Sequence, residues 1–142
     1  FRATRRLVYG RPDPQPGNFK PRFGSTNEFV AITSEEAHRN LKWFFDVYLR
    51  QAHLPRLVTN RTADSLSLQW QTPRGLPFPM PVEVAVDGKR QVVPMSGGRG
   101  TIALPGPYSL VTIDPDSKVL RQSDAIDRYR DEQAGKKAKG AS

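Results

Sequence analysis

The two histidines are the side chains of this chain best suited to bind a metal ion. His38 and His53 are fifteen positions apart, and no His-Glu-x-x-His pair occurs in the sequence. A zinc site needs several nitrogen, oxygen or sulfur ligands that converge within about 2 Å of the ion. One histidine is predicted at a helix corner and the other in a loop, so this spacing favours no shared site. We assign no metal ligand and no catalytic residue.

Other motifs that could carry chemistry are better explained as turns. The segment Ser96–Gly100 is rich in glycine, but no Lys-Ser/Thr follows it and it leads into a predicted strand rather than a helix. Asp114 and Asp116 flank a proline, and two carboxylates alone fall short of the six or more oxygens that calcium takes. There is no Gly-x-Ser-x-Gly elbow and no cysteine. An active site is therefore not predicted.

The net charge of +8 raises the possibility of nucleic-acid binding. The excess is spread along the chain, however, as +4 in residues 1–54, +2 in 55–120 and +2 in 121–142. A groove that follows phosphates needs clustered cations, because its affinity comes from counterions released together. The charge is better explained as a solvated surface with a basic tail. No apolar run reaches the length of a membrane span, so no membrane partner is expected.

Helices are predicted in the first third of the chain. Residues 1–9 look like the end of a helix that stops at Gly10, and a loop rich in proline and glycine follows over 11–24. Ser25 and Glu28 have the spacing of a capping box.

Two further helices are predicted over 26–37 and 40–51, with Asn40 capping the second. The second carries a broad apolar stripe at helical spacing: Leu41, Phe44, Phe45, Tyr48 and Leu49. Because the first helix is a thin cover for so aromatic a stripe, we expect Phe44, Phe45 and Tyr48 to form a contact surface.

From Pro55 onward the apolar period changes to two, which predicts strands. Leu66, Leu68 and Trp70 share one parity, so Trp70 is predicted in the core rather than as a platform for a sugar. Asp87-Gly88 is a hairpin turn signal, and six or seven short strands fit into the segment, with Leu57-Val58 in the first and Val119-Leu120 in the last. Turns at this spacing indicate a small antiparallel, immunoglobulin-like β-sandwich.

Prolines stiffen the start of one predicted strand, over residues 78–86. All three prolines of segment 77–81 have the parity opposite to Phe78, so the strand must begin at a sheet edge or outside the ladder. Phe78 is predicted either to cover the sandwich core or to project as part of an interface.

The expected fold class is α+β. A helical segment over residues 1–54 is followed by the sandwich over 55–120, and then by a short polar helix with a basic, disordered tail over 121–142.

The run Ser25 to Leu57 resembles the aminopeptidase N-like zinc metallopeptidases. It combines a Thr-Asn-Glu-Phe helix start, the second-helix segment Asn40–Phe45, Tyr48-Leu49 and the segment Leu54–Leu57. In that family this segment closes the catalytic domain and leads into a β-sandwich. The sandwich strands and the segment Val111–Asp116 are also similar to bacterial members, so the resemblance covers roughly residues 1–120.

The chain departs from this family at two positions. His38 stands where the family often has glycine, at a corner that can require a positive φ, and histidine tolerates such a φ better than most residues. Tyr48 stands where the family usually has tryptophan.

The resemblance implies that the catalytic parts of the parent enzyme would precede Phe1. These are the His-Glu-x-x-His helix, a downstream glutamate ligand, a Gly-x-Met-Glu-Asn strand and a catalytic tyrosine. Zinc would be the parent's cofactor, and no cofactor is expected in this chain. Because the first residue is Phe rather than Met, we expect a fragment, a processed product or an incomplete record of a longer chain. Its compartment is left open between bacterial cytoplasm and periplasm.

The leading expectation is therefore a non-catalytic, structural end of such a peptidase. Its partner would be the remainder of the parent, or a second copy through apolar surface at Phe44, Phe45, Tyr48 and Phe78. The alternative is a free-standing immunoglobulin-like module that binds a protein or carbohydrate.

Overall fold

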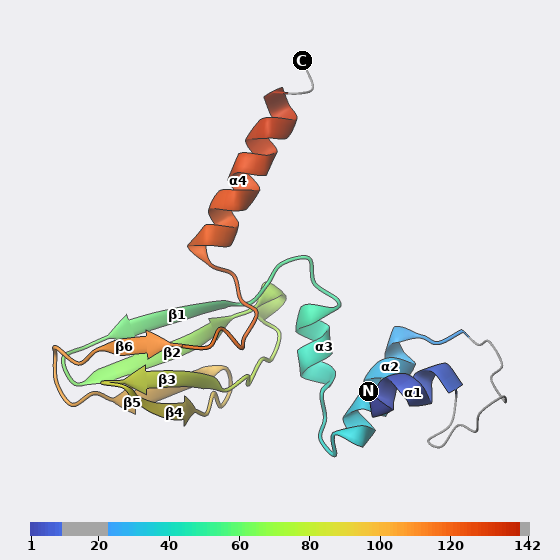
Figure 1. Cartoon of the computed structure of the whole chain (residues 1–142), viewed down its shortest axis with the longest axis horizontal. Helices are drawn as coiled ribbons and strands as arrows, with labels where there is room; N and C mark the ends of the chain where they lie inside the picture. The colour runs from blue at the N-terminus through green and yellow to red at the C-terminus, as the bar shows by residue number, and fades with distance from the viewer. Residues whose placement is uncertain (10–22, 140–142) are drawn as a thin grey trace. The chain divides into compact units, whose positions relative to one another are not determined.

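The computed structural model describes residues 1–9 and 23–139, with side chains up to Gln133. The chain divides into a helical unit, Phe1–Arg50, and a sandwich unit, Gln51–Ser142 (Figure 1). The predicted stop at Gly10 and most of the proline-rich loop lie outside the described residues.

The helical unit contains α1 (Arg2–Tyr9), α2 (Thr26–Glu36) and α3 (Lys42–Tyr48). The predicted helices are confirmed. Helix α3 is shorter than the predicted range 40–51, and Leu41 and Leu49 of the apolar stripe lie just outside it. The cap of α2 is as predicted, since Ser25 Oγ accepts the Glu28 N–H at 3.1 Å. At the corner after α2, His38 adopts a φ of 51°, as the comparison with glycine at this position anticipated.

The start of α3 is fixed by polar side chains on both sides of the corner. Asn40 Oδ1 accepts the Lys42 N–H at 2.9 Å, and Ser34 Oγ accepts the Leu41 N–H at 3.1 Å. These bonds satisfy backbone donors that have no partner inside the helix.

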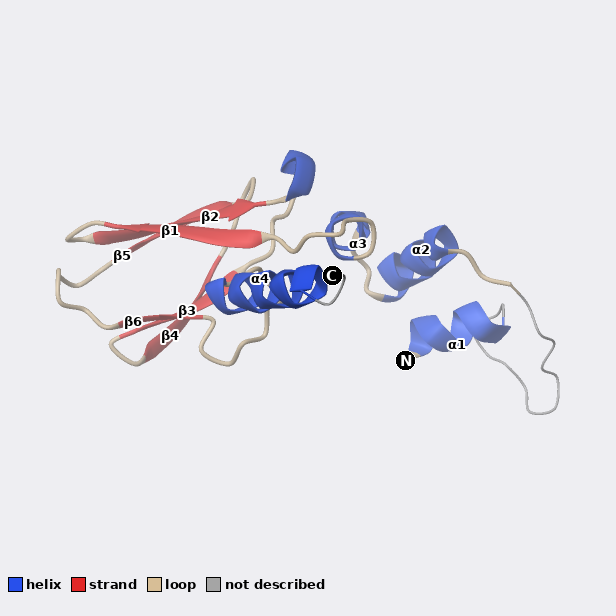
Figure 2. Cartoon of the chain, turned by 90° about the horizontal axis from the view of Figure 1, so that it is seen from above, coloured by secondary structure: helices blue, strands red, loops and turns tan. Residues whose placement is uncertain are grey.

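The sandwich unit contains two antiparallel three-stranded sheets, which form two layers in Figure 2. The first sheet has the order β1-β2-β5, with β1 (Arg56–Arg61), β2 (Ser65–Gln71) and β5 (Arg99–Ala103). The second has the order β4-β3-β6, with β3 (Val82–Val86), β4 (Lys89–Val93) and β6 (Val111–Ile113). The predicted α+β class is thus observed.

The core of the sandwich unit is formed by side chains that alternate along the strands. It consists of Leu66, Leu68, Trp70, Phe78, Val82, Val84, Val86, Val93, Met95 and Leu104. The alternation arises because successive strand residues point to opposite faces of a sheet. The prediction that Trp70 is a core residue is confirmed, and its indole N–H donates to Met80 O at 2.8 Å.

Two strand predictions are modified by the structure. The strand expected over 78–86 begins only at Val82, because the prolines before it lack the N–H groups that a ladder needs. No strand forms at Val119-Leu120, since the Val119 N–H is taken by a carboxylate oxygen of Asp114 at 3.0 Å.

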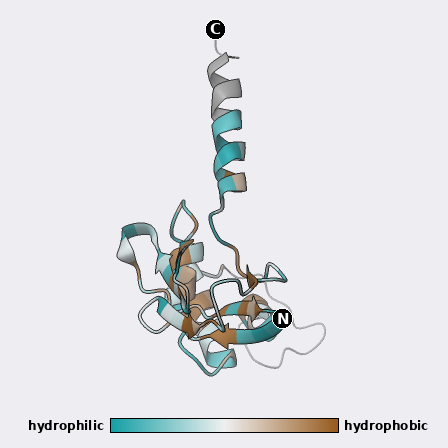
Figure 3. Ribbon diagram, turned by 90° about the vertical axis from the view of Figure 1, so that its left-hand side faces the viewer, coloured by the Kyte–Doolittle hydropathy of each residue, from teal (hydrophilic) through white to brown (hydrophobic). Residues whose placement is uncertain are grey.

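After the sandwich, α4 runs from Asp124 to Lys139, so the prediction that the chain is disordered from Ala134 is wrong as far as Lys139. Alanine, lysine and glutamine, which recur in this segment, are strong helix formers. Its described side chains are mainly hydrophilic in Figure 3. Among the described helices, none combines the length and hydropathy needed to cross a bilayer.

Candidate contact surfaces

An aromatic cluster joins α2 and α3 in the helical unit. The ring of Phe45 lies 5.6 Å from that of Phe29 and 5.3 Å from that of Phe44, measured between centroids in edge-on geometry. Phe44 in turn lies 4.8 Å from Tyr48 and 5.9 Å from Trp43. Such pairs add stability beyond the burial of their area.

Three of the four predicted contact residues therefore lie together, but they are not equally accessible. Phe45 is only 8% exposed, because Phe29 and Phe44 enclose its ring, so it forms the centre of the cluster rather than its surface. Phe44 and Tyr48 are half-buried and keep part of their rings accessible. We call Phe44 and Tyr48 the aromatic surface of α3.

The prediction that Phe78 belongs to a contact surface is wrong. Its side chain is 2% exposed and lies in the sandwich unit, with its ring 5.1 Å from that of Trp70. The prolines on either side hold the segment across the end of the sandwich. The alternative prediction, that this segment covers the core, is the one observed.

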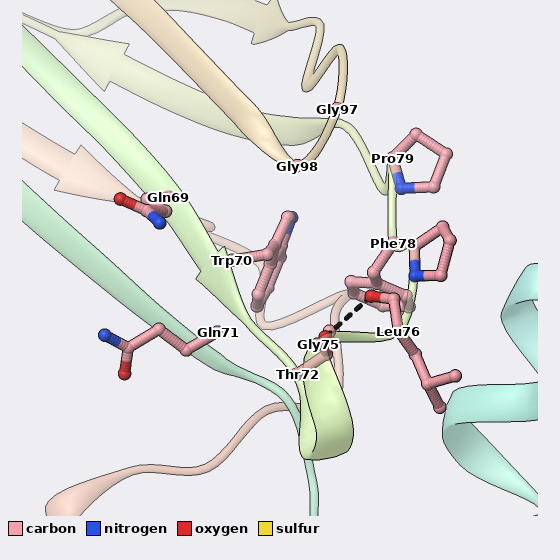
Figure 4. A pocket seen from close by; sticks show the side chains of 11 residues that line it. Gln69, Trp70, Gln71, Thr72, Gly75, Leu76, Phe78, Pro79, Gly97 and Gly98 are labelled. Carbon is pink, nitrogen blue, oxygen red and sulfur yellow. Dashed lines mark hydrogen bonds between the residues drawn. The ribbon is translucent and has the colours of Figure 1, made fainter.

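The segment that carries Phe78 also forms one wall of a groove of about 690 Å³ (Figure 4). The opposite wall is the end of β2, from Gln69 to Gln71, with the following Thr72, and the turn Gly97-Gly98 lies at the rim. Thr72 Oγ1 donates to Leu76 O at 2.6 Å, which fixes the loop between the two walls. Among the described residues that line this groove, none is charged and none is histidine, so the groove offers shape and apolar surface but no acid or base.

One residue beside this groove adopts a strained backbone. Arg74 has a φ of 58° within the short helical turn η1 (Pro73–Gly75). A positive φ costs energy for residues other than glycine and is found where the surrounding structure enforces it.

Four charged side chains form a network on the outer face of the β4-β3-β6 sheet. Arg90 makes a two-pronged contact with Asp116, at 2.6 and 3.1 Å, and its Nη1 also contacts Glu83 at 3.0 Å. Lys118 Nζ contacts Glu83 at 2.8 Å and Asp116 at 3.0 Å. Hydrogen bonds from Arg90 and then Lys118 lower the pKa of Asp116 from 3.8 to about 2.

The Asp-Pro-Asp motif is a structural turn. Asp114 is 5% exposed, and its two carboxylate oxygens accept the N–H groups of Lys118 and Val119 at 2.9 and 3.0 Å. Both oxygens are therefore engaged by the protein's own backbone. Asp116, the second acid of the motif, belongs to the charged network instead.

The described residues bring together no group of three histidine, cysteine, aspartate or glutamate side chains that could hold a metal ion. His38 and His53 belong to different units.

Exposed apolar and basic groups also gather at the β3–β4 hairpin and the loop after β5, a surface that the sequence patterns do not predict. The alternation of apolar and polar residues predicts only strands and turns in these segments.

No protein-family profile matches the chain, and a search among curated proteins finds no match either.

Proposed function

We propose that this chain is a non-catalytic part of an aminopeptidase N-like zinc metallopeptidase, in which the sandwich unit braces neighbouring parts of the enzyme. The observation that carries the proposal is the run from Ser25 to Leu57, whose motifs resemble the segment that closes the catalytic domain in that family. Zinc and the catalytic residues belong to the proposed parent and not to this chain.

The order of the two units supports this proposal. Helices α2 and α3 come first, the division falls between Arg50 and Gln51, and an antiparallel sandwich follows. The family has the same order at the end of its catalytic domain.

The helical unit also has the character of an incomplete part. None of the residues of α1 or α2 is fully buried, and the aromatic surface of α3 leaves Phe44 and Tyr48 partly accessible. Apolar rings at the surface of a small helical unit are suited to pack against another folded part of the same enzyme.

The direct experiment is to read the coding sequence upstream of Phe1 and to express the complete polypeptide. We expect a His-Glu-x-x-His motif upstream, about one bound zinc per polypeptide, and release of the N-terminal residue from an aminoacyl p-nitroanilide. A coding sequence without that motif would refute the proposal and favour a free-standing binding module.

A second experiment tests the contact surface on the present chain. Replacing both Phe44 and Tyr48 by serine should reduce binding of a hydrophobic dye and any self-association of the chain. The matched control is Tyr129→Ser, which removes a ring that is 63% exposed on α4. If the control lowers dye binding as much as the double variant does, the aromatic surface of α3 is not the contact surface.

A further inference from the structure

Strand β4 provides a free edge in the sandwich unit. Among the described strands, the order β4-β3-β6 gives β4 a neighbour on one side only. The two-residue turn Asp87-Gly88 makes Val86 and Lys89 a hydrogen-bonded pair, and the pairs alternate from there along the hairpin. The backbone N–H and C=O groups of Arg90 and Val92 therefore point away from β3.

The other side of β3 supports the same assignment. Glu83 is the partner of Val92 in the hairpin, and Glu83 O accepts the Asp114 N–H from the β6 side at 2.7 Å. Since the backbone of Glu83 bonds toward β6, it does not bond to Val92, whose own groups remain at the free edge.

A recess of about 240 Å³ lies between β4 and the end of β5. Its apolar lining residues are Val86, Ala103 and Pro105, and its polar ones are Lys89, Arg90 and Gln91. The described lining includes two cations and no acid. Arg90 is held by Asp116 and Glu83, whereas Lys89 makes no ion pair within the described part of the chain.

The loop after β5 is fixed beside this recess and presents apolar side chains. Arg61 Nη2 donates to Pro107 O at 2.9 Å and to Ser109 O at 2.8 Å, and Asp87 Oδ1 accepts the Leu110 N–H at 2.8 Å. The loop nevertheless leaves Tyr108 95% exposed and Leu110 77% exposed. Apolar groups held rigidly in solvent are characteristic of recognition surfaces.

We propose that the edge of β4 binds an extended acidic peptide by strand addition. Its backbone pairs with Arg90 and Val92, and an apolar side chain enters the recess between β4 and Pro105. Its carboxylates lie beside Lys89, whose charge has no partner in the described chain. Strand addition works in this way, with backbone bonds providing affinity and side-chain pockets providing specificity.

Charge selects this occupant over a second copy of the chain. Pairing two β4 strands would bring two Lys89 and two Arg90 side chains to one edge, and cations on an edge strand oppose such pairing. An acidic strand instead neutralises Lys89. This inference concerns the sandwich unit alone and does not depend on the proposed parent enzyme.

The test uses the full chain and a fluorescein-labelled peptide of sequence Glu-Val-Glu-Ile-Glu-Val, followed by fluorescence anisotropy. The comparison peptide has lysine in place of each glutamate. We expect saturable binding of the acidic peptide, weakening with added salt, and no binding of the basic one. The variant Lys89→Glu should weaken binding by about tenfold or more. The control Arg99→Glu makes the same charge change on β5 and should leave binding unchanged.

A second pair of variants tests the backbone contribution. Val92→Pro removes the N–H group at the free edge without removing a bond to β3, and Val92→Thr keeps that group. The proline variant should lose binding while the threonine variant retains it, with circular dichroism showing that both remain folded. If Val92→Pro fails to fold, the Lys89→Glu variant still tests the proposal. The Lys89 side chain is exposed, so its replacement should not disturb folding.

Several outcomes would overturn the proposal. These are no binding of the acidic peptide, equal binding of both peptides, or binding that is insensitive to Lys89→Glu. Dimerisation of the chain that Val92→Pro abolishes would assign the edge to a second copy instead.

Discussion

The helical unit and the sandwich unit differ in what holds each of them together. In the described helical unit the fully buried apolar side chains are Phe45 and Val47, and both belong to α3. The sandwich unit encloses Pro55 and ten larger hydrophobic side chains, which come from strands of both sheets and from the segments that join them. Burial of apolar area is the main source of folding free energy, so the sandwich has a core of its own.

The helical unit relies instead on ion pairs between α1 and α2. Arg6 contacts Glu35 and Glu36, each at 2.9 Å, and Arg2 contacts Glu36 at 3.3 Å. Arg6 and Glu36 are largely covered, whereas Glu35 and Arg2 are exposed, and pairs with an exposed partner contribute little because water solvates the separate charges. The sandwich unit is therefore suited to fold by itself. The helical unit has few buried apolar side chains and depends in part on ion pairs.

The largest expected effect is on the sandwich core. Phe78→Ala should lower the free energy of unfolding of the sandwich unit by about 3–5 kcal/mol, because it removes a buried ring that packs on Trp70. Trp70 reports this unfolding by its fluorescence if Trp43 is first replaced by phenylalanine. The control Phe45→Ala lies in the helical unit and should leave the Trp70 transition nearly unchanged. A similar loss for both variants would show that the two units unfold together.

The next effect is at Gly100 in β5, which lies against Val93 of β4 and the two residues that follow it. A Cβ on Gly100 would lie 2.7 Å from Val93 Cγ1 and 2.8 Å from both Met95 Sδ and Pro94 O. Gly100→Ala should therefore destabilise the sandwich unit by about 1–3 kcal/mol through overpacking, measured by urea unfolding. Gly106→Ala is the matched control, since a Cβ there meets nothing within 4 Å. A neutral Gly100→Ala would indicate that this core accommodates extra volume.

A smaller effect is expected in the helical unit. Arg6→Ala removes the cation shared by Glu35 and Glu36, and it should speed hydrogen exchange of the α1 amides without changing the Trp70 transition. Arg5→Ala, which removes a guanidinium from the same helix without affecting either glutamate, is the control. Unchanged exchange in α1 would mean that apolar contacts of α1 with α2 outweigh the ion pairs.

The smallest effect is the pH dependence of the charged network. Because the folded pKa of Asp116 is lowered from 3.8 to about 2, its stabilising contribution is present above about pH 3.8 and is lost as the pH falls through about 2. The free energy of unfolding, measured with urea, should fall more between about pH 5 and about pH 2 for the wild type than for Asp116→Asn. Equal losses would show that the network does not stabilise the folded sandwich.

Much of the fold followed from local patterns in the sequence. The capping spacing of Ser25 and Glu28 predicted the start of α2, because a cap involves residues only three positions apart. The Asp87-Gly88 turn predicted the β3–β4 hairpin, since few residues adopt its backbone angles: φ is 49° at Asp87 and 80° at Gly88.

The contact residues were predicted less well. The aromatic stripe correctly brought Phe44, Phe45 and Tyr48 together, because helical spacing is local. It did not show that Phe29 would enclose Phe45, which depends on the angle between α2 and α3. For Phe78 the alternation allowed both burial and exposure. Its burial depends on contact with Trp70 of β2, which the local pattern does not predict.

By itself the sequence determined which segments are helices and strands, where the hairpins turn, and which strand faces are apolar. Each of these is set by steric and hydrogen-bonding preferences over a few neighbouring residues. Tertiary structure alone decided that β4 lies at an edge, that Pro105 closes a recess beside it, and that Phe78 packs on Trp70. Those features depend on which distant segments become neighbours, and that is fixed only when the two sheets pack around a common core.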